Sequence, residues 1–275
     1  MGEHRTVALA IAAHPDDIEF MMGGTMMLLK ESGCETHYMT IANGSCGSAT
    51  LPRGKIVRIR AREARQGAEA LGAVYHPSYV DDIEIRYDRE LLARVAAVVR
   101  DVDPGVLLVP SLEDYMEDHV NACRLAVSAA FCRGMRNFPT CPPVEPVDTE
   151  LTAYHALPYG LRDALGRRVF AGHYVDVSTV MERKRAALAM HRSQKEWLGY
   201  SQGLDAYVSR MEEMTCEVGR MSGRFEAAEG WRRHNHLGFC APGSDPLADA
   251  LGEKVFVDED YARDLEGPPW PHQSS

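Results

Sequence analysis

Along the chain, short apolar runs alternate with longer amphipathic segments. The first run, Val7 to Ala13, has no charged residue and is typical of a strand buried on both faces of a sheet. Helical spacing follows over 18–32, ended by Gly33, and again over 53–71, ended by Gly72. Further strands are predicted at 37–42, 73–75 and 106–110, and further helices at 89–101 and 120–132.

This alternation predicts an α/β fold in which parallel strands are joined by right-handed helical crossovers. We expect a Rossmann-like, three-layer arrangement with a mainly parallel sheet and an irregular C-terminal extension. In the second half, 151–157 and 169–177 are predicted strands, 181–198 is a predicted helix, and the part from Pro242 is a predicted surface tail. The 275 residues fit a single domain over 1–275, with a core at about 6–200 and C-terminal helices and tail over 201–275.

Composition narrows the classes of partner. The formal net charge of −10 argues against nucleic acid or an anionic membrane as the main partner, because both attract basic surfaces. No apolar run has membrane-spanning length, and the N-terminus has no signal-peptide pattern. The seven cysteines are scattered without a C-x-x-C pair, which predicts reduced thiols and a cytoplasmic protein. The sequence is compatible with a homo-oligomer and does not set the number of subunits.

Two strand ends carry candidate chemistry. His14, Asp16 and Asp17 follow the first strand directly, and Asp118 and His119 follow the strand at 106–110. Parallel strands expose their carboxyl ends at one edge, where ligands of open α/β sheets bind. Two imidazoles and one carboxylate leave coordination positions free, which is the pattern of a catalytic metal site. The structural alternatives are that the aspartates cap helices and that His119 is a surface residue.

The motifs also resemble a known family. The stretches AHPDDIEFMMGGT (13–25), TIANGSCGS (40–48) and EALG (69–72), with the later Asp118-His119 pair, resemble the PIG-L/LmbE-like zinc-dependent N-deacetylases over about 6–132. The resemblance implies removal of an acyl group, usually acetyl, from a small N-acylated amino sugar or related conjugate. It implies one Zn²⁺ per chain, or another divalent ion in its place. Carried over by position, it implies the following roles: His14, Asp17 and His119 as metal ligands, Asp16 as general base, Arg60 as substrate and oxyanion contact, and Asn43 as a second substrate contact.

One departure from the family pattern affects the mechanism. Met116 stands where many relatives have a second histidine, so another residue must protonate the leaving amine. His236 is our candidate, with a surface histidine as the alternative. We also expect the proline-rich segment Pro139 to Val147 and the segment around His236 to line the cavity above His14.

Three functional hypotheses follow. The first is the zinc-dependent N-deacetylase, in which Asp16 takes a proton from a metal-activated water. The second is a non-haem iron oxygenase, because two histidines and a carboxylate also form a facial triad. The third is a metal-containing binding protein without catalysis, which Met116 permits.

Overall fold

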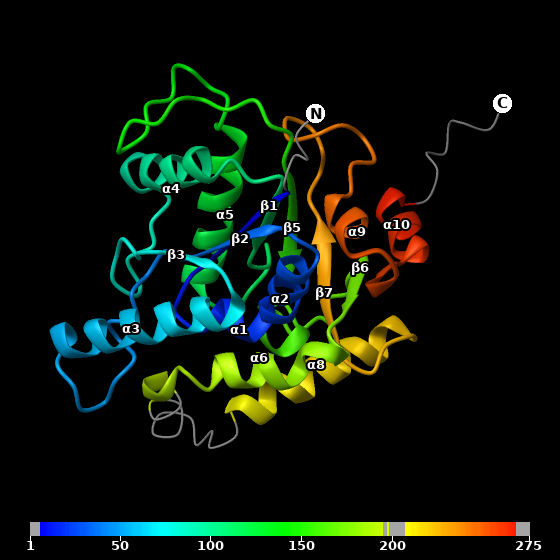
Figure 1. Cartoon of the computed structure of the whole chain (residues 1–275), viewed down its shortest axis with the longest axis horizontal. Helices are drawn as coiled ribbons and strands as arrows, with labels where there is room; N and C mark the ends of the chain where they lie inside the picture. The colour runs from blue at the N-terminus through cyan, green and yellow to red at the C-terminus, as the bar shows by residue number, and fades with distance from the viewer. Residues whose placement is uncertain (1–5, 195–196, 198–206, 268–275) are drawn as a thin grey trace.

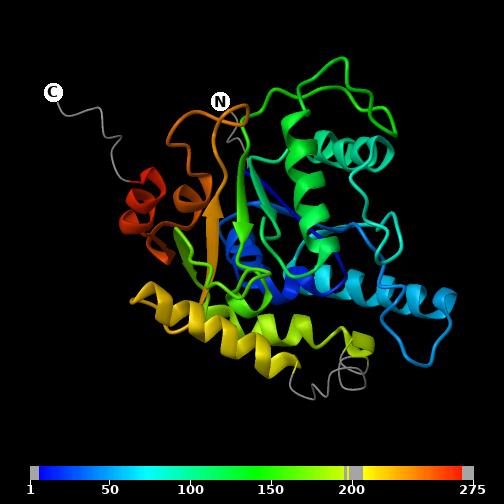
Figure 2. The ribbon, with the colours of Figure 1, turned by 180° about the vertical axis from the view of Figure 1, so that it is seen from behind.

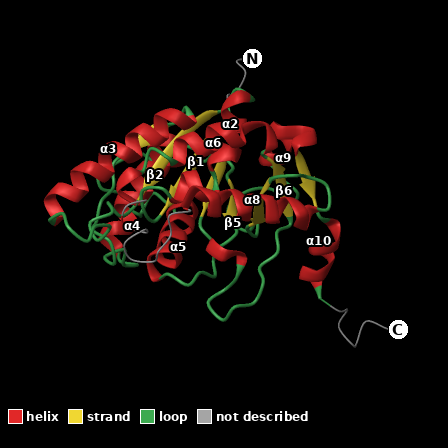
Figure 3. Cartoon of the chain, turned by 90° about the horizontal axis from the view of Figure 1, so that it is seen from below, coloured by secondary structure: helices red, strands yellow, loops and turns green. Residues whose placement is uncertain are grey.

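The computed structural model describes residues 6–194, 197 and 207–267. Within this part, one sheet has the strand order β3-β2-β1-β4-β5-β7-β6-β8, and helices pack on both of its faces (Figures 1 and 3). The strands are β1 Val7–Ala12, β2 Glu35–Thr40, β3 Val74–His76, β4 Val106–Val109, β5 Thr152–Ala156, β6 His173–Asp176, β7 Ala228–Arg233 and β8 Val255–Val257. The helices are α1 Asp17–Met21, α2 Gly23–Glu31, α3 Arg53–Leu71, α4 Arg89–Val102, α5 Glu117–Phe131, α6 Met181–Leu188, α8 Tyr207–Ser222, α9 Pro246–Leu251 and α10 Glu259–Glu266.

Strand β1 lies at the centre of the three layers. Ala8 and Ala10 face one cluster with apolar side chains of α2, α3 and α6. Leu9 and Ile11 face the opposite cluster with side chains of α4 and α5. Because both faces are covered, every position of the strand interior must be apolar, which explains its uninterrupted run. The predicted three-layer α/β fold is confirmed.

The sheet has a parallel and an antiparallel part. Strands β3, β2, β1, β4 and β5 pair in parallel, with Leu9 of β1 opposite His37 of β2 and Leu107 of β4. Beyond β5, the pairs β5–β7, β7–β6 and β6–β8 are antiparallel. The prediction of a surface tail after Pro242 is wrong, because this part of the chain forms α9, the edge strand β8 and α10.

The predicted helix over 18–32 is divided at Met22 into α1 and α2. A Cβ atom at Gly24 would lie 2.5 Å from Cγ1 of Val177, so only glycine permits this approach. The carboxylate of Glu229 accepts hydrogen bonds from the backbone N–H groups of Gly24 and Thr25, each at 2.8 Å. It thus satisfies two of the N–H groups that a helix start leaves unpaired.

The described part of the chain contains no helix that is both long and apolar enough to cross a bilayer. All seven cysteines are free thiols.

Candidate metal centre and active site

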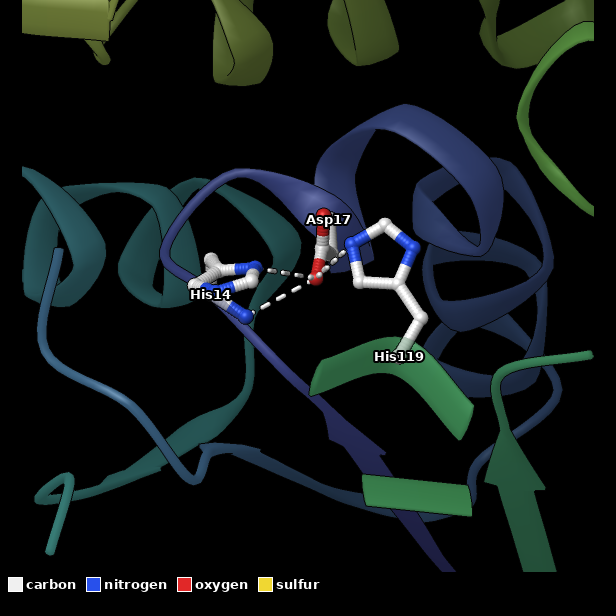
Figure 4. A group of neighbouring side chains, drawn as sticks. All are labelled: His14, Asp17 and His119. Atoms are coloured by element: carbon white, nitrogen blue, oxygen red, sulfur yellow. Dashed lines mark hydrogen bonds and ion pairs between the residues drawn. The ribbon is translucent and has the colours of Figure 1, made fainter. Parts of the chain in front are cut away.

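The two predicted strand ends meet at the carboxyl edge of the parallel strands. His14 follows β1, Asp17 begins α1, and His119 lies in the first turn of α5, which follows β4. Because β1 and β4 are neighbouring parallel strands, both segments emerge at the same edge. One potential ligand atom from each of the three side chains lies within 4.8 Å of the others (Figure 4). The structure therefore brings together the three predicted metal ligands.

The ring nitrogens of the two histidines divide into inner and outer ones. Oδ2 of Asp17 lies 3.7 Å from Nδ1 of His14 and 3.5 Å from Nε2 of His119, so these nitrogens face the centre. The outer nitrogen of His14 lies 2.9 Å from Oδ2 of Asp118, and that of His119 lies 3.1 Å from Oδ1 of Asp114. Carboxylates behind metal-binding histidines fix the ring orientation and raise the basicity of the ligand. The donor set and these outer carboxylates fit a divalent ion such as zinc.

Local charges show that the group of ligands favours positive charge. Burial alone would lower the pKa of His14, but its hydrogen bond with Asp118 and its interactions with Asp17 raise the pKa to about 10. Burial would raise the pKa of Asp17, but His119 and His14 together lower it well below its usual range. The surrounding carboxylates thus favour a positive charge between the two imidazoles.

Asp16 is not one of the three grouped ligands, lines the same cavity and is 2% exposed. Its backbone is left-handed, with φ of 99°. The hydroxyl of Tyr207 donates a hydrogen bond to Oδ2, and Nη2 of Arg60 lies 3.4 Å from Oδ1. Burial raises the pKa of Asp16 to about 6, although Arg60 opposes this shift. A carboxylate with that pKa can exchange a proton near neutral pH.

Arg60 reaches Asp16 from α3 and is itself 2% exposed. Its Nη2 donates to the carbonyl of Pro15 at 2.7 Å, and its Nη1 donates to Oε1 of Gln194. A Cβ atom at Gly44, where φ is 77°, would lie 2.1 Å from Nε of Arg60. The glycine-rich loop after β2 therefore leaves room for the guanidinium beside the site.

Asn43 shapes this loop. Its side-chain amide donates to Oδ1 of Asp81 at 2.7 Å, and its Oδ1 accepts from the backbone N–H of Ser45 at 3.0 Å. The residues that line the cavity do not include Asn43. The side chain of Asn43 is therefore engaged within the loop and lies outside the cavity lining, where the predicted substrate contact would have to be made.

The structure does not bring His236 to the metal ligands. Strand β7 runs antiparallel to β5, so the chain after β7 returns to the amino edge of the parallel strands. There the carbonyl of Phe239 accepts from the N–H of Leu151, which precedes β5, and the N–H of Phe239 donates to His236. The segment Pro139 to Val147 follows the end of α5 that is remote from His119 (Figures 1 and 2). The expectation that both segments line the cavity is wrong.

The three ligands, Asp16 and Arg60 all line one cavity of about 220 Å³. Aromatic side chains form much of its wall. Phe20 lies 5.4 Å, between ring centroids, from both Tyr159 and Tyr207, and Tyr115 lies 6.2 Å from Tyr159. The other lining residues are Met21, Cys46, Gly47, Asp82, Ile83, Met116, Gln194 and Trp197.

Several residues of this site were not predicted. Tyr207 contacts Asp16 from α8, 191 residues later, and no local pattern marks it. Nε2 of His191 lies 2.8 Å from Oε1 of Glu19, and both side chains are fully buried. The sequence around either residue alone does not predict this pair, because its two members are 172 residues apart.

Comparison with known proteins agrees with this geometry. Residues 9–131 match the model of the PIG-L family, described as GlcNAc-PI de-N-acetylase. The chain is 28% identical to diacetylchitobiose deacetylase of Thermococcus kodakarensis over 215 residues, which cover 74% of this chain and 78% of the relative. It is also 28% identical to 4-oxalmesaconate hydratase of Pseudomonas putida over 208 residues, covering 73% and 78%. The structure of N,N'-diacetylchitobiose deacetylase from Pyrococcus horikoshii shares the fold, with a TM-score of 0.72, 22% identity, and 88% and 89% of the two chains covered.

Proposed function

We propose that this chain, whose residues 9–131 match the PIG-L family model, is a metal-dependent N-deacetylase of small N-acetylated amino sugars. One observation carries the proposal. His14, Asp17 and His119 offer three ligand atoms within 4.8 Å of one another, at the carboxyl edge of the sheet and beside the buried Asp16. Three protein ligands leave room for water and substrate, as in catalytic metal sites.

We propose zinc as the ion, held by Nδ1 of His14, Nε2 of His119 and the carboxylate of Asp17. A divalent ion bound there would act as a Lewis acid on an amide carbonyl and would lower the pKa of water from 15.7 to about 7. The outer carboxylates Asp118 and Asp114 hold the two imidazoles in the orientation that presents these nitrogens.

Asp16 is proposed as the general base. Its carboxylate lines the cavity next to the ligands without belonging to them, and burial raises its pKa to about 6. Arg60 and Tyr207 hold the two oxygens, so the carboxylate has one orientation. Because the guanidinium of Arg60 already contacts Pro15 and Asp16, we propose that it positions the base; contact with the oxyanion stays a prediction.

The leaving amine needs a proton that neither Met116 nor His236 can supply. Met116 lines the cavity but has no acidic proton, and His236 lies at the other edge of the sheet. Asp16, once protonated, is the group beside the ligands that can return a proton. We propose that it serves in both proton transfers.

The hydratase relative suggests a second candidate, the addition of water to an unsaturated carboxylate. An anionic substrate needs cationic partners. Besides the proposed metal ion, Arg60 is the permanent cation among the described residues that line the cavity, and Asp16, Gln194 and the Pro15 carbonyl already engage it. The site therefore supports the deacetylase better. The relatives are hydrolases and a hydratase, which favours neither the oxygenase nor the non-catalytic hypothesis.

We retain the cytoplasm as the proposed location. The seven free thiols, with no disulfide among them, support it.

The experiment measures acetate release from N-acetylglucosamine by the zinc-loaded chain, with zinc content determined in parallel. We expect Asp16→Asn to lower kcat about 10²–10⁴-fold and to retain zinc. His119→Ala is the matched variant, which should lose both zinc and activity. Asp16→Asn with normal kcat would contradict the role of the base. If the wild type hydrates unsaturated carboxylates and releases no acetate, the second candidate is correct.

A further inference from the structure

A strained turn lies at the rim of the cavity. The N–H of Glu84 donates to the carbonyl of Asp81 at 3.2 Å, which closes a turn with Ile83 at its third position. Ile83 has φ of 66°, in the left-handed region that β-branched residues avoid. A turn with positive φ at this position normally has glycine or asparagine there. Isoleucine is thus an unfavourable choice for the backbone.

The contacts of the turn account for its backbone conformation. The N–H of Ile83 donates to Oδ2 of Asp118 at 2.7 Å, and the same oxygen lies 2.9 Å from Nε2 of His14. The carboxylate of Asp82 accepts from the N–H groups of Gly44 and Cys46, at 2.7 and 2.9 Å. Glycine at position 83 would donate the same hydrogen bond with less strain. The contacts therefore explain the turn but not the isoleucine side chain.

The side chain of Ile83 contributes little to packing, because it is 70% exposed. It lines the same cavity as the metal ligands, together with Tyr115, which is 58% exposed. His119, by contrast, is 5% exposed. The metal ligand is thus buried, whereas Ile83 and Tyr115 give the cavity lining exposed apolar surface, next to the half-buried carboxylate of Asp82.

We infer that Ile83 is a specificity residue that contacts an apolar alkyl or aryl group attached to the amine side of the substrate, as in an apolar glycoside of an N-acetyl amino sugar. This inference rests on the proposed N-deacetylase function. The scissile amide must reach the ligands at the base, so the rest of the substrate extends towards the rim. There an apolar group removes exposed surface of Ile83 and Tyr115 from water, which favours binding.

The test compares acetate release from N-acetylglucosamine and from its octyl β-glycoside, below the micelle concentration of the latter. We expect the wild type to have the higher kcat/KM with the octyl glycoside. In Ile83→Gly the ratio of the two kcat/KM values should fall roughly tenfold, through KM, because apolar contact is lost. The thermal midpoint of this variant should not fall, because glycine relieves the backbone.

Two further variants serve as controls. Ile83→Leu keeps an apolar side chain and should keep the ratio near the wild-type value. Leu165→Ala removes a side chain that is 82% exposed and lies outside the cavity lining, and it should not change the ratio.

Each contrary outcome has a separate meaning. An unchanged ratio in Ile83→Gly overturns this inference and leaves the deacetylase function intact. N-octanoylglucosamine, which releases octanoate, carries its apolar chain on the acyl side. If Ile83→Gly lowers kcat/KM for this substrate and not for the octyl glycoside, the assignment to the amine side is overturned. Absence of acetate from every substrate overturns the proposed function, and this inference with it.

Discussion

The parallel and antiparallel parts of the sheet contribute to the site in different ways. In the parallel part, the segments that follow β1 and β4, including the first turns of α1 and α5, supply all three candidate ligands and Asp16. The antiparallel part and its helices supply single residues, such as Tyr207 of α8. The comparison teaches that local motifs define the candidate metal centre, whereas long-range packing defines the surroundings of the base.

A buried ion pair lies where the two parts meet. Nζ of Lys184, on α6, lies 2.6 Å from Oε1 of Glu229, on β7, and the two side chains are 1% and 3% exposed. Glu229 also accepts from the first N–H groups of α2 in the parallel part. The start of α2 thus depends on a charge from the antiparallel part.

The largest effect is expected for Lys184→Met. It leaves the carboxylate of Glu229 buried without its cation, so the free energy of unfolding should fall by about 3–5 kcal/mol. Urea unfolding measures the change. Arg183→Met is the matched control, because its ion pair with Glu31 is exposed and should contribute at most about 1 kcal/mol. Equal losses in both variants would show that the two parts are not coupled through this pair.

Next is Tyr207→Phe, which tests whether the antiparallel part tunes the base. Loss of the hydrogen bond to a buried carboxylate should lower kcat/KM by about 10–100-fold, the effect of roughly 1.5–3 kcal/mol. Zinc content should stay the same. The control is Tyr159→Phe, since this ring lines the same cavity without a contact to Asp16 among the described hydrogen bonds. Equal losses would indicate a general effect of the cavity wall.

The free energy of unfolding should depend on pH through a histidine pair where the two parts meet. Nε2 of His155, on β5, lies 2.9 Å from Nδ1 of His234. Burial, together with this neighbouring histidine, lowers the pKa of His155 to about 3. An unfolded histidine has a pKa near 6.5, so at lower pH the unfolded state binds the proton first. The contribution of His155 to stability is complete above pH 6.5 and is lost as the pH falls towards about 3.

The measurement is urea unfolding at pH 7.5 and 5.0. At 1.36 kcal/mol per pH unit, His155 should account for about 2 kcal/mol of the stability lost on acidification. His155→Gln should lose correspondingly less between these two pH values. An identical loss in variant and wild type would mean that His155 does not couple protonation to folding.

The smallest effect is expected for Asn43→Ala, within the parallel part. Removal of its hydrogen bonds to Asp81 and Ser45 should lower the free energy of unfolding by about 1 kcal/mol, with little change in KM for N-acetylglucosamine. A rise in KM without loss of stability would instead support the substrate contact predicted from the family resemblance.

The sequence by itself determined the local part of this protein. An uncharged run followed by His14-Pro15-Asp16-Asp17 determines a buried strand and the polar turn at its end, because side-chain polarity and proline geometry act over neighbouring residues. The second strand end with His119 follows the same rule. Parallel strands share one carboxyl edge, so the meeting of these segments could be predicted before the structure was known.

Tertiary structure decided what depends on strand direction and on distant partners. His236 lies at the far edge because β7 runs antiparallel to β5, and the polarity pattern of a single strand is the same in both directions. Tyr207, Gln194 and Glu229 act through contacts across roughly 130 to 205 residues of chain. Such contacts arise from packing of whole elements, for which local sequence carries no signal.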